Sequence, residues 1–181
     1  MLRHLTLVLL ALAEVPPVAT PPVFKGVPKP PEAVYEAELT GVATERAQAE
    51  MKTALAQLES DPRLSEAEKR DIKSKLPRFR LALYTTTKTF DEIVFFYEGA
   101  LKNQFVFAER DLMTDVRETC RLAGVPVDPA VAAAWQGKRG HSARWARDDR
   151  AMEIDIEDHL IDPRDGKVTR KTVVLISSVA P

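Results

Sequence analysis

The stretch FRLALYTTTKTFDEIVFFYEGAL, residues 79–101, contains the clearest secondary-structure signals in the chain. From Phe79 to Leu83 every second residue is a large apolar one, the period of two that is typical of a half-buried strand. Thr89 and Glu92 have the spacing of a capping box, which marks the first turn of a helix. A wide apolar face then continues to Leu101. The stretch therefore predicts a strand that passes directly into a helix, with aromatic side chains that dominate the core.

The same residues carry a resemblance. The segment YTTTKTFDEI (84–93), followed by Phe96 and Tyr97, resembles a recurring segment of small exported bacterial proteins of unknown function. In those proteins a strand ends in Tyr-x-Thr, and a helix begins Ser/Thr-Phe-Asp-Glu-Val and continues to Phe-Tyr. The resemblance implies a small exported α+β domain and implies no active site.

Helices are expected on both sides of this unit. Apolar residues recur at three- and four-residue steps over residues 44–59, and a capping box at Ser65 and Glu68 begins a second helix that ends before Pro77. After the unit, residues 104–108 suggest a short strand. Residues 111–123 and 128–135 are predicted to be helices, with Gly124 ending the first and residues 136–142 forming an exposed loop.

The C-terminal part is expected to be an antiparallel sheet. Strands are predicted over residues 144–148, 152–157 and 168–179, with a turn at 162–167. Together with the strand that begins at Phe79, they predict an α+β fold: an antiparallel sheet of about four strands with helices packed on one face.

The N-terminus resembles an export signal. A basic start is followed by an apolar run to Ala13, and Ala11 and Ala13 match the small-x-small cleavage rule. We expect a signal peptide over residues 1–13 and a mature chain, periplasmic or secreted, that begins at Glu14. The apolar run is shorter than the roughly 20 residues that cross a bilayer, so no transmembrane span is expected.

Seven of the 13 prolines lie between Pro16 and Pro31. Proline fixes φ and lacks a backbone donor, which favours an extended, hydrated polyproline II segment. Residues 14–36 are thus predicted to be a Pro-rich linker, with a single α+β domain over residues 37–181. A Pro-rich arm that docks in the aromatic groove of a partner is the alternative.

Composition excludes several classes of protein. The 26 Lys and Arg residues balance 27 Asp and Glu residues, which argues against a dedicated nucleic-acid binder. A single cysteine, Cys120, excludes an internal disulfide framework and a thiolate zinc cluster. The seven glycines form neither a phosphate-binding loop nor a dinucleotide fingerprint. We expect no cofactor, no bound metal and no nucleic-acid partner.

The sharpest chemical candidate is the acidic strand, residues 153–159. Its alternation places Glu153, Asp155, Glu157 and His159 on one face, opposite an apolar face. These side chains could hold a cation or divide acid and base roles, with His141 as a further candidate base. The alternative is the hydrated face of a hairpin, balanced by arginines on neighbouring strands.

Two further features could carry chemistry. The basic stretch 138–150 contains Arg144 and Arg147, which we expect either to contact a protein partner or to pair with the acidic strand. It also contains Trp145, which we expect to be either a partner contact or a core anchor. Cys120 could be a nucleophile with His141 or His159 as base, but its helix position favours a buried structural thiol.

Two functions remain open. The first is an exported, non-enzymatic binding or assembly module that presents its sheet or aromatic helix to a protein partner in the cell envelope or to a small ligand. The second is a small exported hydrolase or lyase, with or without a metal, that uses the acidic strand from Glu153 to His159.

Overall fold

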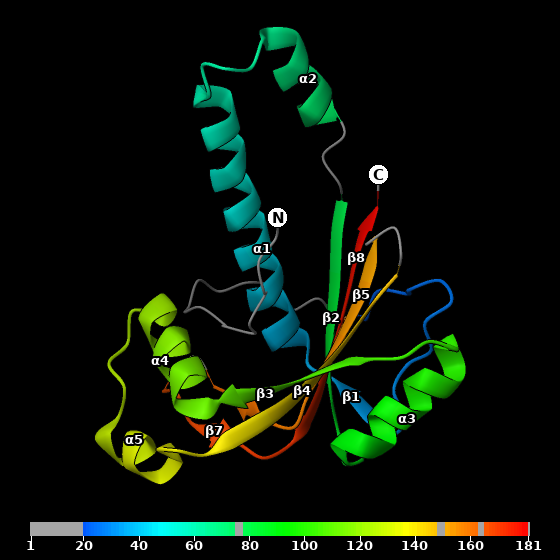
Figure 1. The fold of residues 1–181 in the computed structure, drawn as a ribbon, viewed down its shortest axis with the longest axis vertical. Coiled ribbons are helices and arrows are strands. Elements are labelled where there is room, and N and C mark those ends of the chain that lie inside the picture. Colours follow the sequence, from blue (N-terminus) through cyan, green and yellow to red (C-terminus); the bar gives the residue numbers. More distant parts are fainter. Residues whose placement is uncertain (1–19, 75–77, 148–150, 163–164, 181) are drawn as a thin grey trace.

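A six-stranded antiparallel sheet organises the molecule. The computed structural model describes residues 20–74, 78–147, 151–162 and 165–180 (Figure 1). The strand order is β1-β2-β8-β5-β4-β3, and each neighbouring pair is antiparallel. The strands are β1 (Ala33–Tyr35), β2 (Arg78–Thr86), β3 (Val106–Asp111), β4 (Arg139–Ala146), β5 (Met152–Glu157) and β8 (Thr172–Ala180). The α+β class is confirmed, whereas the expectation of about four strands was too low.

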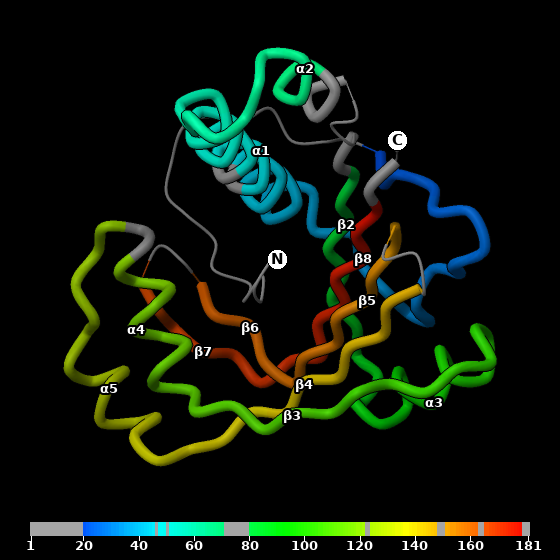
Figure 2. The backbone as a smooth tube through the Cα atoms, turned by 45° about the horizontal axis from the view of Figure 1, so that its top comes forward, coloured from blue at the N-terminus to red at the C-terminus, as the bar shows by residue number. Residues whose placement is uncertain are grey.

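Five helices and a small hairpin surround the sheet. The helices are α1 (Ala37–Ser60), α2 (Glu66–Ser74), α3 (Phe90–Leu101), α4 (Leu112–Ala123) and α5 (Pro129–Trp135). The hairpin consists of β6 (Leu160–Ile161) and β7 (Val168–Thr169), which lie beside α4 in Figure 2.

Helices cover both faces of the sheet, so the prediction that they pack on one face is wrong. Leu81 and Leu83 of β2 pack against Ala43 of α1. Ala82 and Tyr84, which point the other way, belong to the cluster that contains the buried face of α3. The strand is apolar on both faces because it lies between two helices, which are on opposite sides of the sheet in Figure 1. We call these sides the α1 face and the α3 face.

The strand-to-helix unit forms where its sequence predicts, although β2 is buried on both faces over residues 81–86 and not half-buried as expected. Thr89 caps α3, its hydroxyl accepting from the Glu92 N–H while the Glu92 carboxylate accepts from the Thr89 N–H. Ile93, Val94 and Tyr97 of α3 are then buried against the sheet. The same logic holds at Ser65 and Glu68, where a second capping box precedes α2.

Part of the expected linker belongs to the domain. The leader, residues 1–13, and the first six residues after it lie outside the described residues. From Phe24 onward the chain packs: Phe24 is buried in the main core, and the Tyr97 hydroxyl donates to the Pro28 carbonyl at 3.1 Å. Ala33–Tyr35 then pair with β2 as an edge strand. The solvated linker predicted over residues 14–36 therefore does not hold for residues 24–35, because their few apolar side chains find a core.

Helix α1 also completes the edge of the sheet that β1 leaves short. The Thr40 hydroxyl accepts a hydrogen bond from the Leu83 N–H at 3.0 Å, just past the point where β1 ends. Thr40 is buried, so this bond satisfies a backbone donor that would otherwise be left without a partner.

Two predictions about the C-terminal half were wrong in detail. Residues 139–142, expected in a loop, are the first half of β4, because they pair with residues 108–111 of β3. Their polar side chains give no apolar alternation that would reveal a strand. The single strand predicted over 168–179 is divided into β7 and β8, with Arg170 and Lys171 between them. Both changes matter for the site, since they bring His141 and Arg170 toward the end of β5.

Candidate functional site

The acidic strand is half-buried rather than freely hydrated. In β5, Met152, Ile154 and Ile156 are buried on the α3 face, as the alternation predicts. The side chains of Asp155 and Glu157, on the α1 face, are only 15% and 12% exposed. An acidic row in this position needs cations from neighbouring elements.

Two arginines supply those cations. Arg144, opposite Asp155 on β4, donates from Nε to Asp155 Oδ1 at 2.5 Å. Arg110 of β3 lies between two carboxylates, 3.4 Å from Glu157 Oε1 and 3.2 Å from Asp115 Oδ2 of α4. This pairing is the intramolecular alternative that the sequence left open for Arg144.

Burial nevertheless dominates the titration of these acids. It raises the pKa of Glu157 to about 7, against the opposing attraction of Arg110. Burial also raises the pKa of Asp155, although the hydrogen bond from Arg144 lowers it in part. Among the described residues, no group of three His, Cys, Asp or Glu side chains is arranged to hold a metal ion. Arginines alternate with the carboxylates instead.

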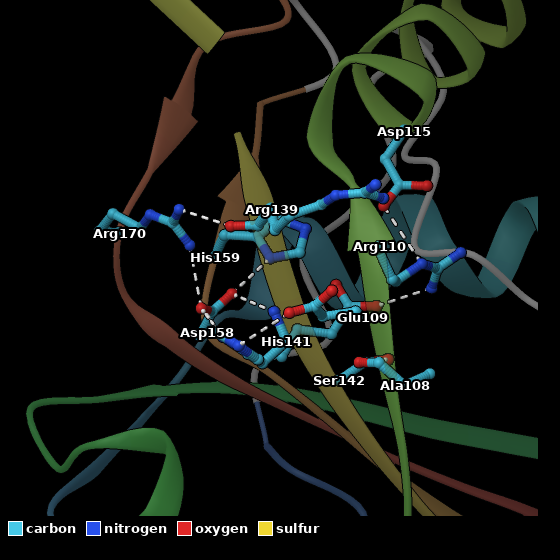
Figure 3. Close-up of polar contacts among 11 residues, drawn as sticks. Ala108, Glu109, Arg110, Asp115, Arg139, His141, Ser142, Asp158, His159 and Arg170 are labelled. Atoms are coloured by element: carbon cyan, nitrogen blue, oxygen red, sulfur yellow. Dashed lines mark hydrogen bonds and ion pairs between the residues drawn. The ribbon is translucent and has the colours of Figure 1, made fainter. Parts of the chain in front are cut away.

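The side chains of His141 and His159 both contact Asp158, a residue that no sequence pattern singled out (Figure 3). Asp158 follows β5 directly. Its carboxylate lies 2.9 Å from His159 Nδ1 and 3.0 Å from His141 Nδ1, and it accepts from the His141 N–H at 3.0 Å. Arg170 donates to the same carboxylate at 2.9 Å and to the Arg139 carbonyl at 2.8 Å. We call Asp158, His141, His159 and Arg170 the Asp158 cluster.

The members of the Asp158 cluster differ in exposure and charge. His159 is 2% exposed, and burial lowers its pKa even though Asp158 works in the opposite direction. Burial alone would raise the pKa of Asp158, but hydrogen bonds from His159 and His141 outweigh it and the net shift is downward. His141 is on the α3 face, with its ring 6.2 Å from that of Phe90. Asp158 is therefore an ionised centre that orients one buried and one exposed imidazole.

The Asp158 cluster contains two of the three groups of a nucleophilic triad, a carboxylate and an exposed histidine. A carboxylate that fixes Nδ1 of an exposed histidine is the arrangement of a general base. Within the described part of the chain, however, no hydrogen bond joins a Ser, Thr or Cys side chain to either histidine. Cys120 is buried among Met113, Val116 and Ile161, and burial raises the pKa of its thiol. It is the structural thiol that its helix position favoured.

The three residues of the basic stretch, Arg144, Trp145 and Arg147, lie in different environments. Trp145 is buried in the main core on the α3 face, which is the core position that was one of the two alternatives expected for it. Arg144 is engaged with Asp155, and Arg147 is exposed just after β4. Alternation alone could have placed Trp145 inward, because it lies two residues from the buried Ala143.

A pocket opens beside the Asp158 cluster. It has a volume of about 470 Å³ and lies between the turn before α3 and the start of β8. Three of its four charged lining residues are basic. The lining consists of Thr86, Thr87, Lys88, Thr89, Phe90, Asp158, Arg170, Lys171 and Thr172. Its volume is in the range of small-ligand sites.

The largest exposed apolar side chains near this end of the sheet lie on α3 and β3. Phe95 of α3 is 78% exposed, and Val106 and Phe107 of β3 are 74% and 58% exposed. The ring of Phe107 packs edge-on against that of Phe90, with the ring centroids 6.4 Å apart. This contact joins β3 to α3. Strand β3 is also the last strand of its sheet and pairs only with β4 among the described strands.

No helix in the described part of the chain is both long enough and apolar enough to cross a membrane. In comparisons with known proteins, no family model, no curated protein and no solved structure matches this chain.

Proposed function

We propose that this protein is an exported, non-enzymatic binding module that presents strand β3 and helix α3 to a protein partner in the cell envelope. The observation that carries the proposal is the open edge of β3, on which Val106 and Phe107 are exposed. We name the surface formed by Phe95, Val106, Phe107 and Glu109 the β3 edge surface.

The backbone groups along the outer edge of β3 suit a partner that binds as an additional strand. The outer edge of β3 presents backbone donors and acceptors that a further strand can pair with, which is the basis of β-strand addition. Natural edge strands are commonly protected by charge, proline or a bulge. Residues 106–108 carry neither a charge nor a proline. Glu109 is exposed, and so is Asp91 at the start of α3, which favours a partner segment with Lys or Arg beside its apolar residues.

The hydrolase or lyase alternative has less support. Two of its three proposed carboxylates, Asp155 and Glu157, are each engaged with an arginine, and His141 lies on the opposite face of the sheet from them. The location in the envelope rests on the export signal expected over residues 1–13 and on the resemblance of residues 84–97 to exported bacterial proteins.

Co-purification from envelope extracts of the source bacterium tests the proposal. The tagged chain is expected to retain one stoichiometric partner. Phe107→Ser is expected to reduce its recovery at least about tenfold, the effect of losing one anchor residue worth about 1.4 kcal/mol or more. Val34→Ser, on the opposite sheet edge, is the matched control, because Val34 is likewise an exposed apolar residue on an edge strand. Equal recovery by wild type and Phe107→Ser would contradict the proposal.

A further inference from the structure

The pocket beside the Asp158 cluster has the chemistry of an anion site. Three of its nine lining residues are cationic, one is aromatic and one is acidic. The other four are threonines, of which Thr86, Thr87 and Thr89 donate their hydroxyls to Pro31, Glu32 and Glu92. We propose that it binds a small organic anion, whose phosphate or carboxylate group lies between Lys88, Arg170 and Lys171 and whose organic part contacts Phe90. This site adjoins the β3 edge surface through the contact between Phe90 and Phe107, but it does not depend on the function proposed above.

The single acid of the lining does not oppose an anion strongly. Asp158 accepts from the His141 N–H and from Arg170, and both imidazoles lie within hydrogen-bonding distance of it. Its negative charge is therefore already shared among fixed donors. Charge-assisted hydrogen bonds of this kind are short and strong, so Asp158 stays directed at its partners.

Arg170 is held in place from several sides. Besides its bonds to Asp158 and the Arg139 carbonyl, its guanidinium lies 5.4 Å from the centre of the Trp135 ring. A guanidinium fixed in this way loses little rotamer freedom when a ligand binds. Arg170 thus provides a preorganised positive wall.

The two lysines have partners that a ligand could replace. Lys88 lies 3.1 Å from Glu32 and 3.7 Å from Glu92, and both carboxylates are more than half exposed. Lys171 lies 3.7 Å from Glu36. Exposed pairs of this kind are worth about 0.2–1 kcal/mol each, so an anion in the pocket can compete for both ammonium groups.

Helix α3 itself is not the source of the binding. The capping box already serves the N–H groups of Thr89 and Glu92, so we assign the contacts to side chains from the turn and from the 170–172 segment. The Phe90 ring supplies an apolar wall, which distinguishes an organic anion from a free inorganic ion.

Titration of the full chain with phenyl phosphate, benzoate and benzyl alcohol at constant ionic strength, followed by NMR chemical shifts or calorimetry, tests the inference. Saturable binding of phenyl phosphate or benzoate is expected, with a Kd of about 1 mM or lower, and the tighter of the two identifies the anionic group. Benzyl alcohol, which has no charge, is expected to bind at least about tenfold more weakly.

The variants are chosen to leave the fold intact. Lys88→Gln with Lys171→Gln is expected to weaken binding at least about tenfold, because these side chains have only loose surface partners. Lys52→Gln with Lys167→Gln removes the same charge from exposed positions outside the pocket and is expected to bind as wild type does. The inference is overturned if neither anion binds saturably, if benzyl alcohol binds as tightly as the anions, or if the first double variant keeps wild-type affinity.

Discussion

Replacing Gly140 by alanine is expected to destabilise the protein by about 2 to 3 kcal/mol, because the new methyl group has no room. A Cβ at this position would lie 2.7 Å from Cε1 and Nδ1 of His159 and 2.7 Å from Leu112 Cδ2. Leu112 is fully buried and His159 nearly so, which means that neither can move aside into solvent. Urea unfolding monitored by circular dichroism measures the change.

Gly99→Ala is the matched control for this substitution. Gly99 lies in α3, and a Cβ there would meet no atom within 4 Å. Alanine is favoured over glycine in a helix by up to about 1 kcal/mol, so this variant is expected to be slightly more stable than wild type. Equal changes in the free energy of unfolding for both alanine variants would show that Gly140 is not closely packed against His159.

Glu157→Gln is expected to raise the free energy of unfolding by about 3 kcal/mol at pH 9 relative to wild type and to leave it nearly unchanged below pH 4.5. Burial raises the pKa of Glu157 from 4.5 to about 7 in the folded chain. The folded state therefore holds this proton more tightly than the unfolded state. The stability that the protonated carboxyl contributes is fully present below about pH 4.5 and is lost as the pH rises through about 7.

The informative quantity is the difference between wild type and variant across this pH range. Burial lowers the pKa of His159, so its contribution is lost as the pH falls below 6.5, but it affects both proteins and cancels in the difference. Glu109→Gln removes an exposed carboxylate of β3 and is expected to change stability by less than about 0.5 kcal/mol. A Glu157→Gln variant that is less stable than wild type at pH 9 would show that the pair with Arg110 outweighs the burial of the carboxylate.

The local signals in the sequence predicted much of the fold. The Thr89 and Glu92 spacing placed the start of α3, and the Asp111 and Gly124 positions bound α4 as expected. Each of these signals lies within about four residues of the helix end that it marks, so no tertiary information is needed. The inward face of β5 was equally clear from its alternation.

Other features depend on contacts between distant residues. Phe24 packs in the core although prolines surround it, and proline content alone predicted a hydrated segment. Gly140 and His141 belong to a strand because they pair with Arg110 and Glu109 of β3. Asp158 gained its partners from β4 and from the segment before β8, a juxtaposition that no spacing along the chain reveals. The acidic strand was found, but the arginines that neutralise it come from two other strands.

Photo-crosslinking in living cells tests directly whether the β3 edge surface binds a protein partner. A benzophenone amino acid at position 107 is expected to give one crosslinked product in the envelope fraction, and the same group at the exposed Gln57 of α1 is expected to give none. An excess of Phe107→Ser chain should leave the product unchanged, whereas an excess of wild-type chain should compete it away. The absence of a specific product at position 107, or an identical product at position 57, would show that the β3 edge surface does not bind a specific partner.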